Sequence, residues 1–332
     1  MKILLIGLGS IGKRHLRNIL FLGYNHVSVV SRSGSLPEEF KGLPVYSSLD
    51  AALNTSKFNV AIICTPTSKH IDSLIPVLAA GIQNIYIEKP VSHSIGEVES
   101  NLDFSSLTNK NIVVGYDLHF DPGFEKVKQL LKSNTIGKPL SVNAQVGQYL
   151  PDWRPYEDYR KGMSARIETG GGVMLDLVHE FDYLYHLFGK AQTIAALYKN
   201  SGSLEIETED VAEVLIQFKS GCLGTIHLDY LQQKLIRNCV ITGSAGTINW
   251  NLAESTVNWI DSAKKESYFT YKEFERNERF VAIMKAFLQN KQDDRLTSLS
   301  DGLESLKMVV AAKKSAEQQQ FVSITSLNHL PA

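Results

Sequence analysis

The sequence predicts an α/β protein with two domains, and three observations support this fold class. The chain has 332 residues, about twice the ~150 residues that a single domain usually needs. Residues 1–120 repeat a short apolar run followed by a helical pattern, which predicts a doubly wound parallel sheet with crossover helices. In residues 121–332, runs that alternate apolar and polar residues follow one another, which predicts an α+β domain with a mostly antiparallel sheet.

The strands expected in the first domain are continuous apolar runs, which are typical of strands covered by helices on both faces. They lie at residues 2–6, 27–30, 59–64, 84–87 and 111–115. Helical patterns are expected between them, at residues 10–22, 68–80 and 95–107. Because helices connect successive strands, we expect the strands to lie parallel in one sheet.

The strands expected in the second domain have a period of two. Leu140, Val142, Ala144 and Val146 alternate with polar residues, as in a strand with one face in solvent. Further strands are expected at residues 212–218, 223–230, 239–242 and 247–250. One helix is expected near residues 173–188, and two more, at about 275–290 and 303–316, close the chain.

The composition excludes several classes of protein. The chain has 34 Lys and Arg against 35 Asp and Glu, so it lacks the positive surplus of a nucleic-acid-binding protein. The three cysteines, Cys64, Cys222 and Cys239, are widely spaced, which excludes a disulfide framework and a thiolate metal site. No apolar run approaches the ~20 residues of a membrane span, and the first residues lack the features of a signal peptide. We therefore expect a cytoplasmic protein.

A GxGxxG motif follows the first expected strand. Gly7 permits a tight turn, Gly9 lets the backbone approach a pyrophosphate, and Gly12 lets the helix pack closely on the strand. The helix that begins with Ser10 and Ile11 offers unpaired N–H groups and a positive dipole end to the phosphates. The motif therefore predicts a dinucleotide site, and the alternative is a glycine-rich turn in another α/β fold.

The end of the second expected strand bears on which dinucleotide binds. An NAD site usually places an Asp or Glu there, on the ribose 2′-hydroxyl. Residues 27–37 contain no acid, and the strand runs into Ser31, Arg32 and Ser33. A guanidinium flanked by two hydroxyl groups suits the 2′-phosphate of NADP. We therefore favour NADP over NAD, and the alternative is an ordinary polar loop.

Further motifs suggest a family. A Thr-Pro-Thr-Ser-Lys-His segment (65–70) follows the third expected strand, and Glu-Lys-Pro (88–90) follows the fourth. The second half contains three consecutive glycines (170–172), followed by Asp176 and His179. With the GxGxxG upstream, this order of motifs resembles the Gfo/Idh/MocA family of oxidoreductases, named for glucose–fructose oxidoreductase and inositol dehydrogenase.

The resemblance implies an N-terminal Rossmann domain and a C-terminal domain built on a large open sheet, which often forms a dimer interface. It implies a tightly bound nicotinamide cofactor and a sugar-type hydroxyl or ketone as the reacting group. By the same resemblance, Lys89, Asp176 and His179 are the catalytic residues. The residues expected near the cofactor at the ends of these strands are Thr65, Pro66, His70, Glu88 and Lys89.

Each of the three implied catalytic residues suits its chemistry. Hydride transfer from a secondary alcohol requires that the hydroxyl proton leaves in step. His179 is the expected base because the ordinary pKa of a histidine, ~6.5, lies near the working pH. Asp176 would orient the imidazole, and Lys89 would donate a hydrogen bond to the substrate oxygen. Asp176 and His179 are three positions apart, whereas in many family members the Asp and His are four positions apart, but on one helix both spacings keep the side chains on one face.

Simpler interpretations of these residues stay open. Lys89 is also consistent with an exposed lysine at the end of a strand. Asp176, His179 and Asp182 also fit the solvent face of a helix, or a set of metal ligands. Since no further cluster of His or Cys completes such a set in the sequence, we predict no metal site.

The substrate is expected to meet a segment rich in aromatic residues, arginines and acids (149–160). Trp153, Arg154, Tyr159 and Arg160 are the candidates for contact with it, together with His179. Aromatic faces and polar groups suit a sugar, and arginines suit a carboxylate or phosphate. The alternative is a surface loop with a small aromatic core of its own.

The expected function is NAD(P)-dependent hydride transfer to or from a sugar, a cyclitol or a nucleotide-sugar. One alternative is an NAD-dependent glycoside hydrolase of the same family, which needs no net supply of cofactor. Another is a non-catalytic, cofactor-binding regulator, against which the intact Lys89, Asp176 and His179 argue. We expect no nucleic-acid or membrane partner, and a homodimer or homotetramer formed through the C-terminal sheet.

Overall fold

The computed structural model describes residues 1–289 and 292–324, which form two compact units. The first unit comprises Met1–Asp117 and Asn277–Leu303, apart from residues 290–291, and the second comprises Leu118–Arg276 and residues 304–324. These units differ from the expected halves, 1–120 and 121–332, because residues 277–303 belong to the first. Asn290, the expected end of a helix, and residues 325–332 lie outside the described residues.

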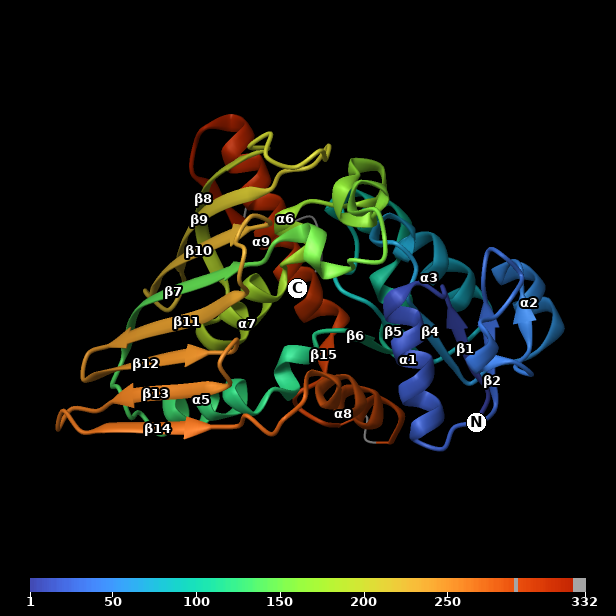
Figure 1. Cartoon of the computed structure of the whole chain (residues 1–332), viewed down its shortest axis with the longest axis horizontal. Coiled ribbons are helices and arrows are strands. Elements are labelled where there is room, and N and C mark those ends of the chain that lie inside the picture. The colour runs from blue at the N-terminus through green and yellow to red at the C-terminus, as the bar shows by residue number, and fades with distance from the viewer. Residues whose placement is uncertain (290–291, 325–332) are drawn as a thin grey trace. The chain divides into compact units, whose positions relative to one another are not determined.

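A seven-stranded sheet forms the centre of the first unit, among the residues described (Figure 1). Its strands are β1 (Ile3–Ile6), β2 (Val27–Val30), β3 (Val45–Tyr46), β4 (Val60–Ile63), β5 (Asn84–Ile87), β6 (Asn111–Val114) and β15 (Thr297–Ser298). Their order is β15-β6-β5-β4-β1-β2-β3, with β1 to β6 parallel and β15 antiparallel to β6. All side chains of β1 and β4 are buried, so the predicted doubly wound parallel sheet is confirmed.

Helices surround this sheet. They are α1 (Ser10–Phe21), α2 (Leu49–Thr55), α3 (His70–Ala79), α4 (Ile95–Asn101) and α8 (Arg276–Gln289). In α1, Leu16 and Ile19 face the core. Helix α8 brings Phe280 to 6.0 Å from the ring of His15 and Phe287 to 5.6 Å from the ring of Tyr86. These aromatic contacts explain why α8 belongs to the first unit.

A nine-stranded sheet forms the centre of the second unit, again among the described residues. Its strands are β7 (Pro139–Gly147), β8 (Ala191–Lys199), β9 (Val211–Phe218), β10 (Leu223–Asp229), β11 (Ile236–Gly243), β12 (Gly246–Asn251), β13 (Thr256–Ile260), β14 (Glu266–Thr270) and β16 (Val322–Ser323). The order is β14-β13-β12-β11-β7-β10-β9-β8-β16. Strands β7 and β10 pair in parallel and the other pairs are antiparallel. The predicted, mostly antiparallel sheet is therefore confirmed.

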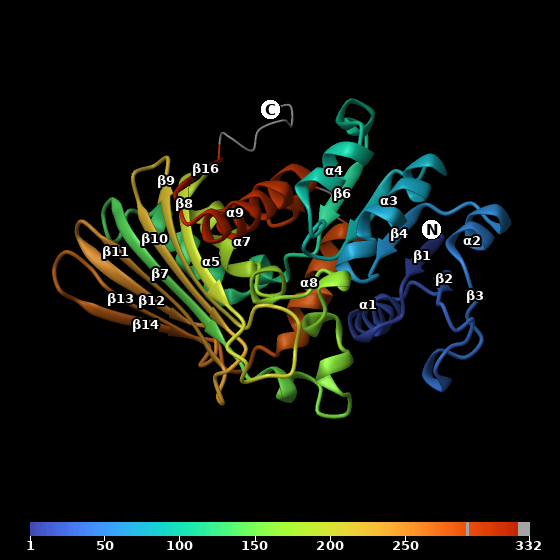
Figure 2. The same cartoon turned by 90° about the horizontal axis from the view of Figure 1, so that it is seen from above.

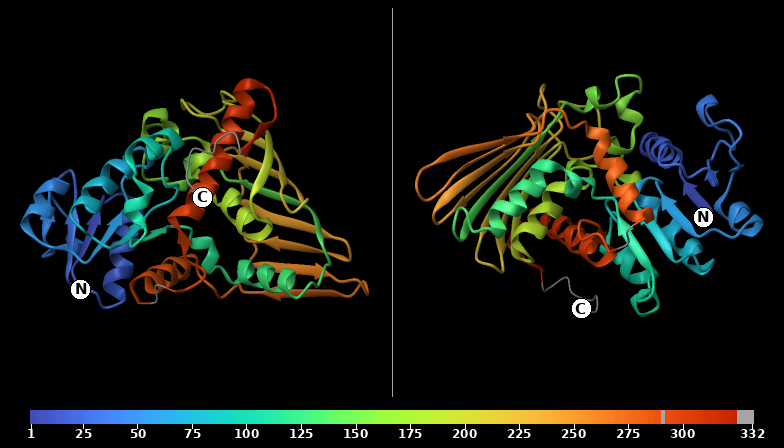
Figure 3. Two further views of the ribbon diagram at one scale, coloured as in Figure 1. Left: turned by 180° about the vertical axis from the view of Figure 1, so that it is seen from behind. Right: turned by 90° about the horizontal axis from the view of Figure 1, so that it is seen from below.

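Helices cover one face of the nine-stranded sheet. They are α5 (Pro122–Lys132), α6 (Val173–Asp176), α7 (His179–Phe188) and the later part of α9 (Leu299–Gln318). Figures 2 and 3 show α5, α7 and α9 on the same side of the strands, and none of the described helices on the other side. Residues of β9 alternate accordingly, with Val214 and Ile216 buried and Leu215 and Gln217 exposed. The second unit therefore has a core on one face of its sheet and an open face on the other.

Some local expectations differ from the structure. The helix expected at residues 173–188 is two helices, because α6 ends at Asp176 and α7 begins at His179. Helices α2 and α5 and strands β8, β13 and β14 were not expected. No described helix is long and apolar enough to span a bilayer.

Candidate active site

The turn between β1 and α1 has the backbone that its glycines predict. Gly7 has a φ of +95°, and a Cβ atom there would lie 2.7 Å from the carbonyl oxygen of Cys64. A Cβ atom on Gly12 would lie 2.1 Å from the carbonyl oxygen of Gly7. A Cβ atom on Gly9 would meet nothing within 4 Å. Gly7 and Gly12 are thus required by packing within the unit, whereas Gly9 faces open space.

The start of α1 fits a dinucleotide pyrophosphate. Gly9 is the N-cap, no side chain caps the helix, and its first turn contains no acid. The N–H groups of Ser10 and Ile11 therefore have no partner further back in the helix. Open space beside Gly9 and these N–H groups together form a site for an anion. It lies at the carboxyl end of β1, next to β4, where the strand order reverses and where ligands of doubly wound folds bind.

The end of β2 carries the three residues expected to select NADP. Ser31 Oγ lies 3.0 Å from Ser33 Oγ, which in turn lies 3.0 Å from Ser35 Oγ. Arg32, between the first two serines, is exposed. The hydroxyl groups thus interact with one another, while the guanidinium extends into solvent at the carboxyl edge of the sheet.

His70 joins two loops at this edge of the sheet. Its side chain is 1% exposed, with Nδ1 2.8 Å from the carbonyl oxygen of Pro90 and Nε2 3.0 Å from that of Thr65. Burial lowers the pKa of His70, and the contact with Pro90 acts in the opposite direction. These contacts hold the Thr65-Pro66 loop against the Glu-Lys-Pro loop. Direct contact of Thr65, Pro66 or His70 with a cofactor stays a prediction.

Glu88 has a structural environment that its motif did not reveal. Its carboxylate is buried, with Oε1 2.7 Å from His15 Nε2 and 3.4 Å from the hydroxyl of Tyr86, which donates to it. Gly115 makes room for it, because a Cβ atom there would lie 2.9 Å from Glu88 Oε1. Lys89 follows Glu88 at the carboxyl end of β5 and is half-buried. Glu88 therefore ties the strand end that carries Lys89 to helix α1.

The contact of His15 with Glu88 was not expected from the sequence, although the position of His15 on its helix indicates that it is buried. His15 lies three residues after Gly12, so the two share the helix face that packs on the sheet. The structure confirms that position, since His15 is 0% exposed.

In the second unit, two of the three consecutive glycines, Gly171 and Gly172, pack closely against neighbouring groups. A Cβ atom on Gly171 would lie 2.3 Å from the carbonyl oxygen of Met163. Gly172 has a φ of +110°, and its Cβ atom would lie 2.4 Å from the carboxylate of Glu209, which pairs with Lys313 at 3.2 Å. The glycines thus allow this segment to pack on Glu209 and on the backbone of residues 163–164.

Asp176 and His179 are brought near the surface of the second unit, each 8% exposed. Asp176 ends α6 and His179 begins α7, so the two residues lie on successive helices, whereas one face of a single helix was expected. Residues 177–178 separate the two helices.

Tyr230 fixes the carboxylate of Asp176. Its hydroxyl donates a hydrogen bond to Asp176 Oδ2 at 2.7 Å, and its side chain is fully buried. Burial raises the pKa of Tyr230 well above its ordinary value, and the charge of Asp176 adds to this shift. Tyr230 is therefore a neutral donor. The alternation along β10 could have indicated that Tyr230 is buried, because Ile226, Leu228 and Tyr230 are spaced two residues apart and the first two are buried.

The aromatic segment of residues 149–160 packs partly on itself. Trp153 donates from Nε1 to the carbonyl oxygen of Gln148 at 3.2 Å and meets the ring of Tyr230 edge-on at 5.4 Å. Trp153, Arg154 and Tyr159 line one hollow of ≈ 20 Å³, about the size of one water molecule. Trp153 is therefore held by Gln148 and Tyr230, both outside the segment.

Arg160 is engaged by two acids. Its guanidinium lies 2.8 Å from Asp158 Oδ1 and 3.2 Å from Glu205 Oε2. All three residues are on the surface, so a substrate anion would compete with carboxylates for Arg160. Contact of Trp153, Arg154, Tyr159 or Arg160 with substrate stays a prediction.

A buried ion pair anchors the helix that carries His179. Glu180 follows His179 in α7 and is fully buried, and Arg237 of β11 donates to its two carboxylate oxygens at 2.8 and 2.9 Å. This bidentate geometry is the strong form of an Arg–carboxylate pair. It fixes the first turn of α7 to the sheet. No local pattern in the sequence indicates that these two residues, 57 positions apart, meet.

Comparison with known proteins gives consistent matches for both halves of the chain. Residues 1–116 match the family described as "Oxidoreductase family, NAD-binding Rossmann fold", and residues 124–249 match the "GFO/IDH/MocA C-terminal domain". The chain is 27% identical over 345 aligned positions to the myo-inositol 2-dehydrogenase of Thermotoga maritima, with 98% of each chain covered. It is 24% identical to the inositol 2-dehydrogenase of Rhizobium meliloti, with 96% of this chain and 98% of the relative covered.

Solved structures share the fold. A levoglucosan dehydrogenase in complex with NADH and levoglucosan matches with a TM-score of 0.82 at 17% identity, covering 97% of this chain and 98% of the other. A protein from Thermotoga maritima described as a "probable dehydrogenase" matches with a TM-score of 0.78 at 23% identity, covering 98% of this chain and 99% of the other.

Proposed function

Because this chain belongs to the Gfo/Idh/MocA family of oxidoreductases, we propose that it transfers a hydride between a nicotinamide dinucleotide and a hydroxyl or ketone of a sugar, cyclitol or nucleotide-sugar. The observation that carries this proposal is the turn at Gly9, whose open space and uncapped helix start fit a pyrophosphate. The substrate class rests on the names of the relatives, which include inositol dehydrogenases and a levoglucosan dehydrogenase.

The proposed mechanism assigns one task to each catalytic residue. When bound, the nicotinamide ring supplies the acceptor or donor of the hydride. Lys89 donates a hydrogen bond from Nζ to the reacting oxygen and stabilises the charge that develops there. His179 takes the hydroxyl proton on its imidazole. Asp176, held by Tyr230 at 2.7 Å, orients that imidazole and stabilises its charged form.

The test of this function is the rate at which the protein, stripped of bound cofactor, converts a substrate when NAD⁺ or NADP⁺ is added. We expect a panel of cyclitols and sugars, supplied with NAD⁺ or NADP⁺, to produce reduced nicotinamide in proportion to the oxidised product. A hydrolase of the same family would turn over its substrate without net reduction. A regulator would bind the dinucleotide and turn over nothing, and either of these results would overturn the proposal.

Replacing Tyr230 with phenylalanine is expected to lower kcat about tenfold or more, because a hydrogen bond to a charged group contributes about 1.5–3 kcal/mol. The change leaves the ring that Trp153 packs on, so the unit should fold. Tyr271→Phe is the matched control, since its buried hydroxyl accepts a hydrogen bond from Trp250 and not from the site. Steady-state kinetics of both variants check this prediction. If Tyr230→Phe had the same kcat as Tyr271→Phe, the role of Tyr230 would be contradicted.

We further propose that NADP is the preferred cofactor, with Ser31, Arg32 and Ser33 around the 2′-phosphate. Arg32→Ala is then expected to raise the Kd of NADPH about tenfold, the loss of one charge-assisted hydrogen bond, and to leave that of NADH almost unchanged. Lys57→Ala is the control. It also removes one positive charge, but at the opposite edge of the sheet, just before β4, and should change neither the Kd of NADPH nor that of NADH. Fluorescence titration measures all four values, and equal losses for NADPH and NADH would refute the preference.

The remaining contacts are proposed for the same reaction. Gly9 and the first N–H groups of α1 contact the pyrophosphate, and Gly7 and Gly12 give the turn the close packing that places them. Thr65, Pro66, His70 and Glu88 shape the neighbouring loops. Trp153, Arg154, Tyr159 and Arg160 take part in substrate binding.

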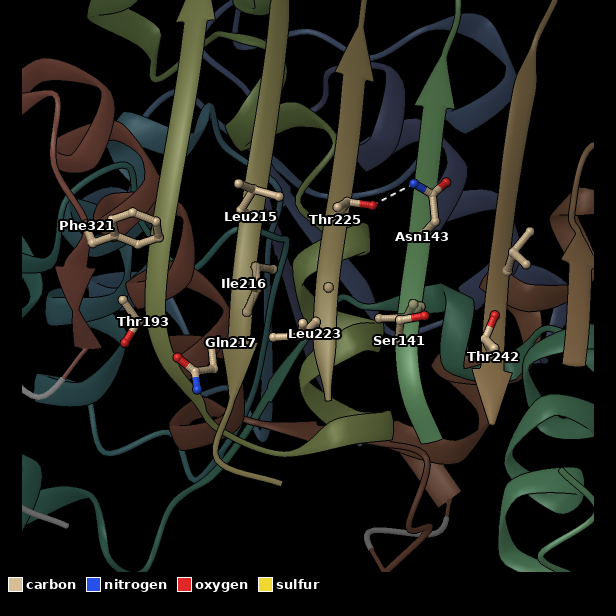
Figure 4. A pocket seen from close by; sticks show the side chains of 13 residues that line it. Ser141, Asn143, Thr193, Leu215, Ile216, Gln217, Leu223, Thr225, Thr242 and Phe321 are labelled. Atoms are coloured by element: carbon tan, nitrogen blue, oxygen red, sulfur yellow. Dashed lines mark hydrogen bonds between the residues drawn. The ribbon is translucent and has the colours of Figure 1, made fainter. Parts of the chain in front are cut away.

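We propose that the chain forms a homodimer or homotetramer through the open face of its nine-stranded sheet. A hollow of ≈ 500 Å³ lies on this face, and Leu215, Leu223 and Phe321 line it with 54%, 58% and 71% of their surface exposed (Figure 4). Asn143 and Thr225 join across neighbouring strands at 2.6 Å. An apolar area of this kind, with paired polar groups beside it, is typical of a surface between subunits.

A reducing compartment suits the three cysteines. Cys64, Cys222 and Cys239 are buried thiols, and burial raises the pKa of each above its ordinary value. Such thiols are unreactive. On this ground we propose a cytoplasmic location. The names of the relatives support a small molecule as substrate, and the balance of 34 Lys and Arg against 35 Asp and Glu supports the absence of a nucleic-acid partner.

A further inference from the structure

A second polar cluster lies within the second unit, around Asp182 of α7. The side chain of Asp182 is fully buried. His119 Nε2 lies 2.7 Å from its Oδ2, Ser305 donates to its Oδ1 at 3.2 Å, and His186 Nδ1 lies 3.5 Å from the same Oδ1. One ligand atom from each of His119, Asp182 and His186 can be chosen so that all lie within 4.8 Å of one another.

The fold orients these three side chains toward one point. Asp182 and His186 are four residues apart on α7 and so share one face of the helix. His119 comes from the segment before α5, and its ring packs on Phe124 at 5.1 Å. The two imidazole rings meet edge to face, with centroids 4.2 Å apart. These contacts bring the three side chains together within the second unit.

The geometry points to a site for a zinc-like divalent cation, which we propose is bound by His119, Asp182 and His186. In a tetrahedral zinc site, with ligands at about 2.0–2.2 Å, neighbouring ligand atoms lie roughly 3.3 Å apart. His119 Nε2 lies 2.7 Å from Asp182 Oδ2, and a nitrogen of His186 lies within 4.8 Å of the ligand atoms of both residues. Nδ1 of His186 donates to the carbonyl oxygen of Asp182 at 3.0 Å, so His186 would bind the ion through Nε2.

The chemistry of the ligands selects the ion. Two imidazoles and one carboxylate suit Zn²⁺, Co²⁺ or Ni²⁺, whereas Mg²⁺ and Ca²⁺ prefer oxygen ligands alone. A fully buried carboxylate needs positive charge beside it, which a divalent cation supplies. His186 has 24% of its side chain exposed, so solvent can reach the proposed site and supply a fourth ligand.

Two other histidines near acids lack this geometry. His227 faces Glu213 with Nδ1, at 2.6 Å, and Asp229 with Nε2, at 2.9 Å, so its two carboxylates lie on opposite sides of the ring. Its hydrogen bonds to them raise the pKa of His227 to about 9, which favours the proton over a metal. His93 lies 3.4 Å from Glu97, a single acid. Both histidines therefore serve as controls.

The ion would stabilise the helix that begins with His179, because two of its ligands lie on that helix and the third on another segment. This role goes beyond hydride transfer and does not depend on it. A chain that binds no nicotinamide could still bind the metal, and the reverse also holds.

The test is metal binding to the full chain after treatment with a chelator. We expect one Zn²⁺ per chain by equilibrium dialysis, a higher thermal midpoint in its presence, and a tetrahedral absorption spectrum with Co²⁺. His186→Ala should weaken Zn²⁺ binding about 100-fold or more, whereas His93→Ala and His227→Ala should not. The thermal midpoint in chelator shows whether His186→Ala is folded.

The proposal fails if the wild-type chain binds no stoichiometric Zn²⁺, or if His186→Ala binds it as tightly as the wild type. Anomalous diffraction from wild-type crystals soaked in Zn²⁺ needs no variant. An ion between His119, Asp182 and His186 would support the site, and an ion found only elsewhere would refute it.

Discussion

Replacing Lys89 with alanine is expected to lower kcat by about 10²- to 10³-fold, the usual contribution of one donor that stabilises a developing negative charge. Lys89 is half-buried at the carboxyl end of β5, beside a carboxylate that is fixed to α1 through His15. The proposed loss is that of the hydrogen bond from Nζ to the reacting oxygen. Cofactor affinity should change little, because the pyrophosphate site is built from the backbone of the Gly7–Gly12 turn.

Two further variants make this prediction specific. Lys110→Ala removes a lysine just before β6, at the opposite edge of the same sheet, and should leave kcat unchanged. Lys89→Arg keeps the charge but changes the shape of the donor, so partial activity is expected. Steady-state kinetics and dinucleotide titration measure kcat and Kd separately. An unchanged kcat for Lys89→Ala would disprove the catalytic assignment.

Replacing Arg237 with alanine is expected to destabilise the second unit by about 3 kcal/mol, because removal of one partner leaves a buried charge without compensation. The charge that remains is Glu180, whose side chain is fully buried, while that of Arg237 is only 15% exposed. Since Glu180 follows His179 directly, activity should fall as well. Urea unfolding followed by far-ultraviolet circular dichroism measures the loss of free energy.

The chain offers a matched control for this ion pair. Arg160 also donates two hydrogen bonds to one carboxylate, that of Asp158, but on the surface. Arg160→Ala should therefore cost less than about 1 kcal/mol. If Arg237→Ala cost no more than Arg160→Ala, the buried pair would not be what anchors α7. The double variant Glu180→Leu, Arg237→Leu should recover much of the stability, since it removes both charges.

Features encoded by neighbouring residues could be predicted from the sequence. The apolar runs of β1, β4 and β5 and the glycine turn at residues 7–12 each depend on a few consecutive residues and on one sheet. The alternation in β7 and β9 similarly predicted a sheet with one open face. These patterns fix local backbone geometry and the side that is buried, which suffices for the fold class and for the dinucleotide turn.

Features that depend on distant segments could not be predicted. Helix α8 returns to the first unit because Phe280 and Phe287 pack on His15 and Tyr86, and no local pattern shows which core an amphipathic helix joins. The break between α6 and α7 was also missed, because the helical periodicity continues through residues 177–178.

The polar contacts of the second unit also join segments that are far apart in the sequence, so they could not be predicted either. We predicted no metal site because only Asp176, His179 and Asp182 lie close together in the sequence. The ligand set now proposed includes His119, 63 residues before Asp182. Tyr230 and Asp176 are 54 residues apart in the sequence. The alternation along β10 indicates that Tyr230 points to the buried side, but no pattern in the sequence indicates that Asp176 is its partner.

The most direct test of the central claim follows the hydride itself. A cyclitol or sugar substrate carrying deuterium on the reacting carbon is incubated with the wild-type protein and NADP⁺ or NAD⁺, and the nicotinamide is examined by mass spectrometry and NMR. The account predicts reduced nicotinamide that carries one deuterium on its ring, in equal amount to the ketone product. Deuterium that stays with the product or passes to water, with no reduced nicotinamide formed, would contradict it.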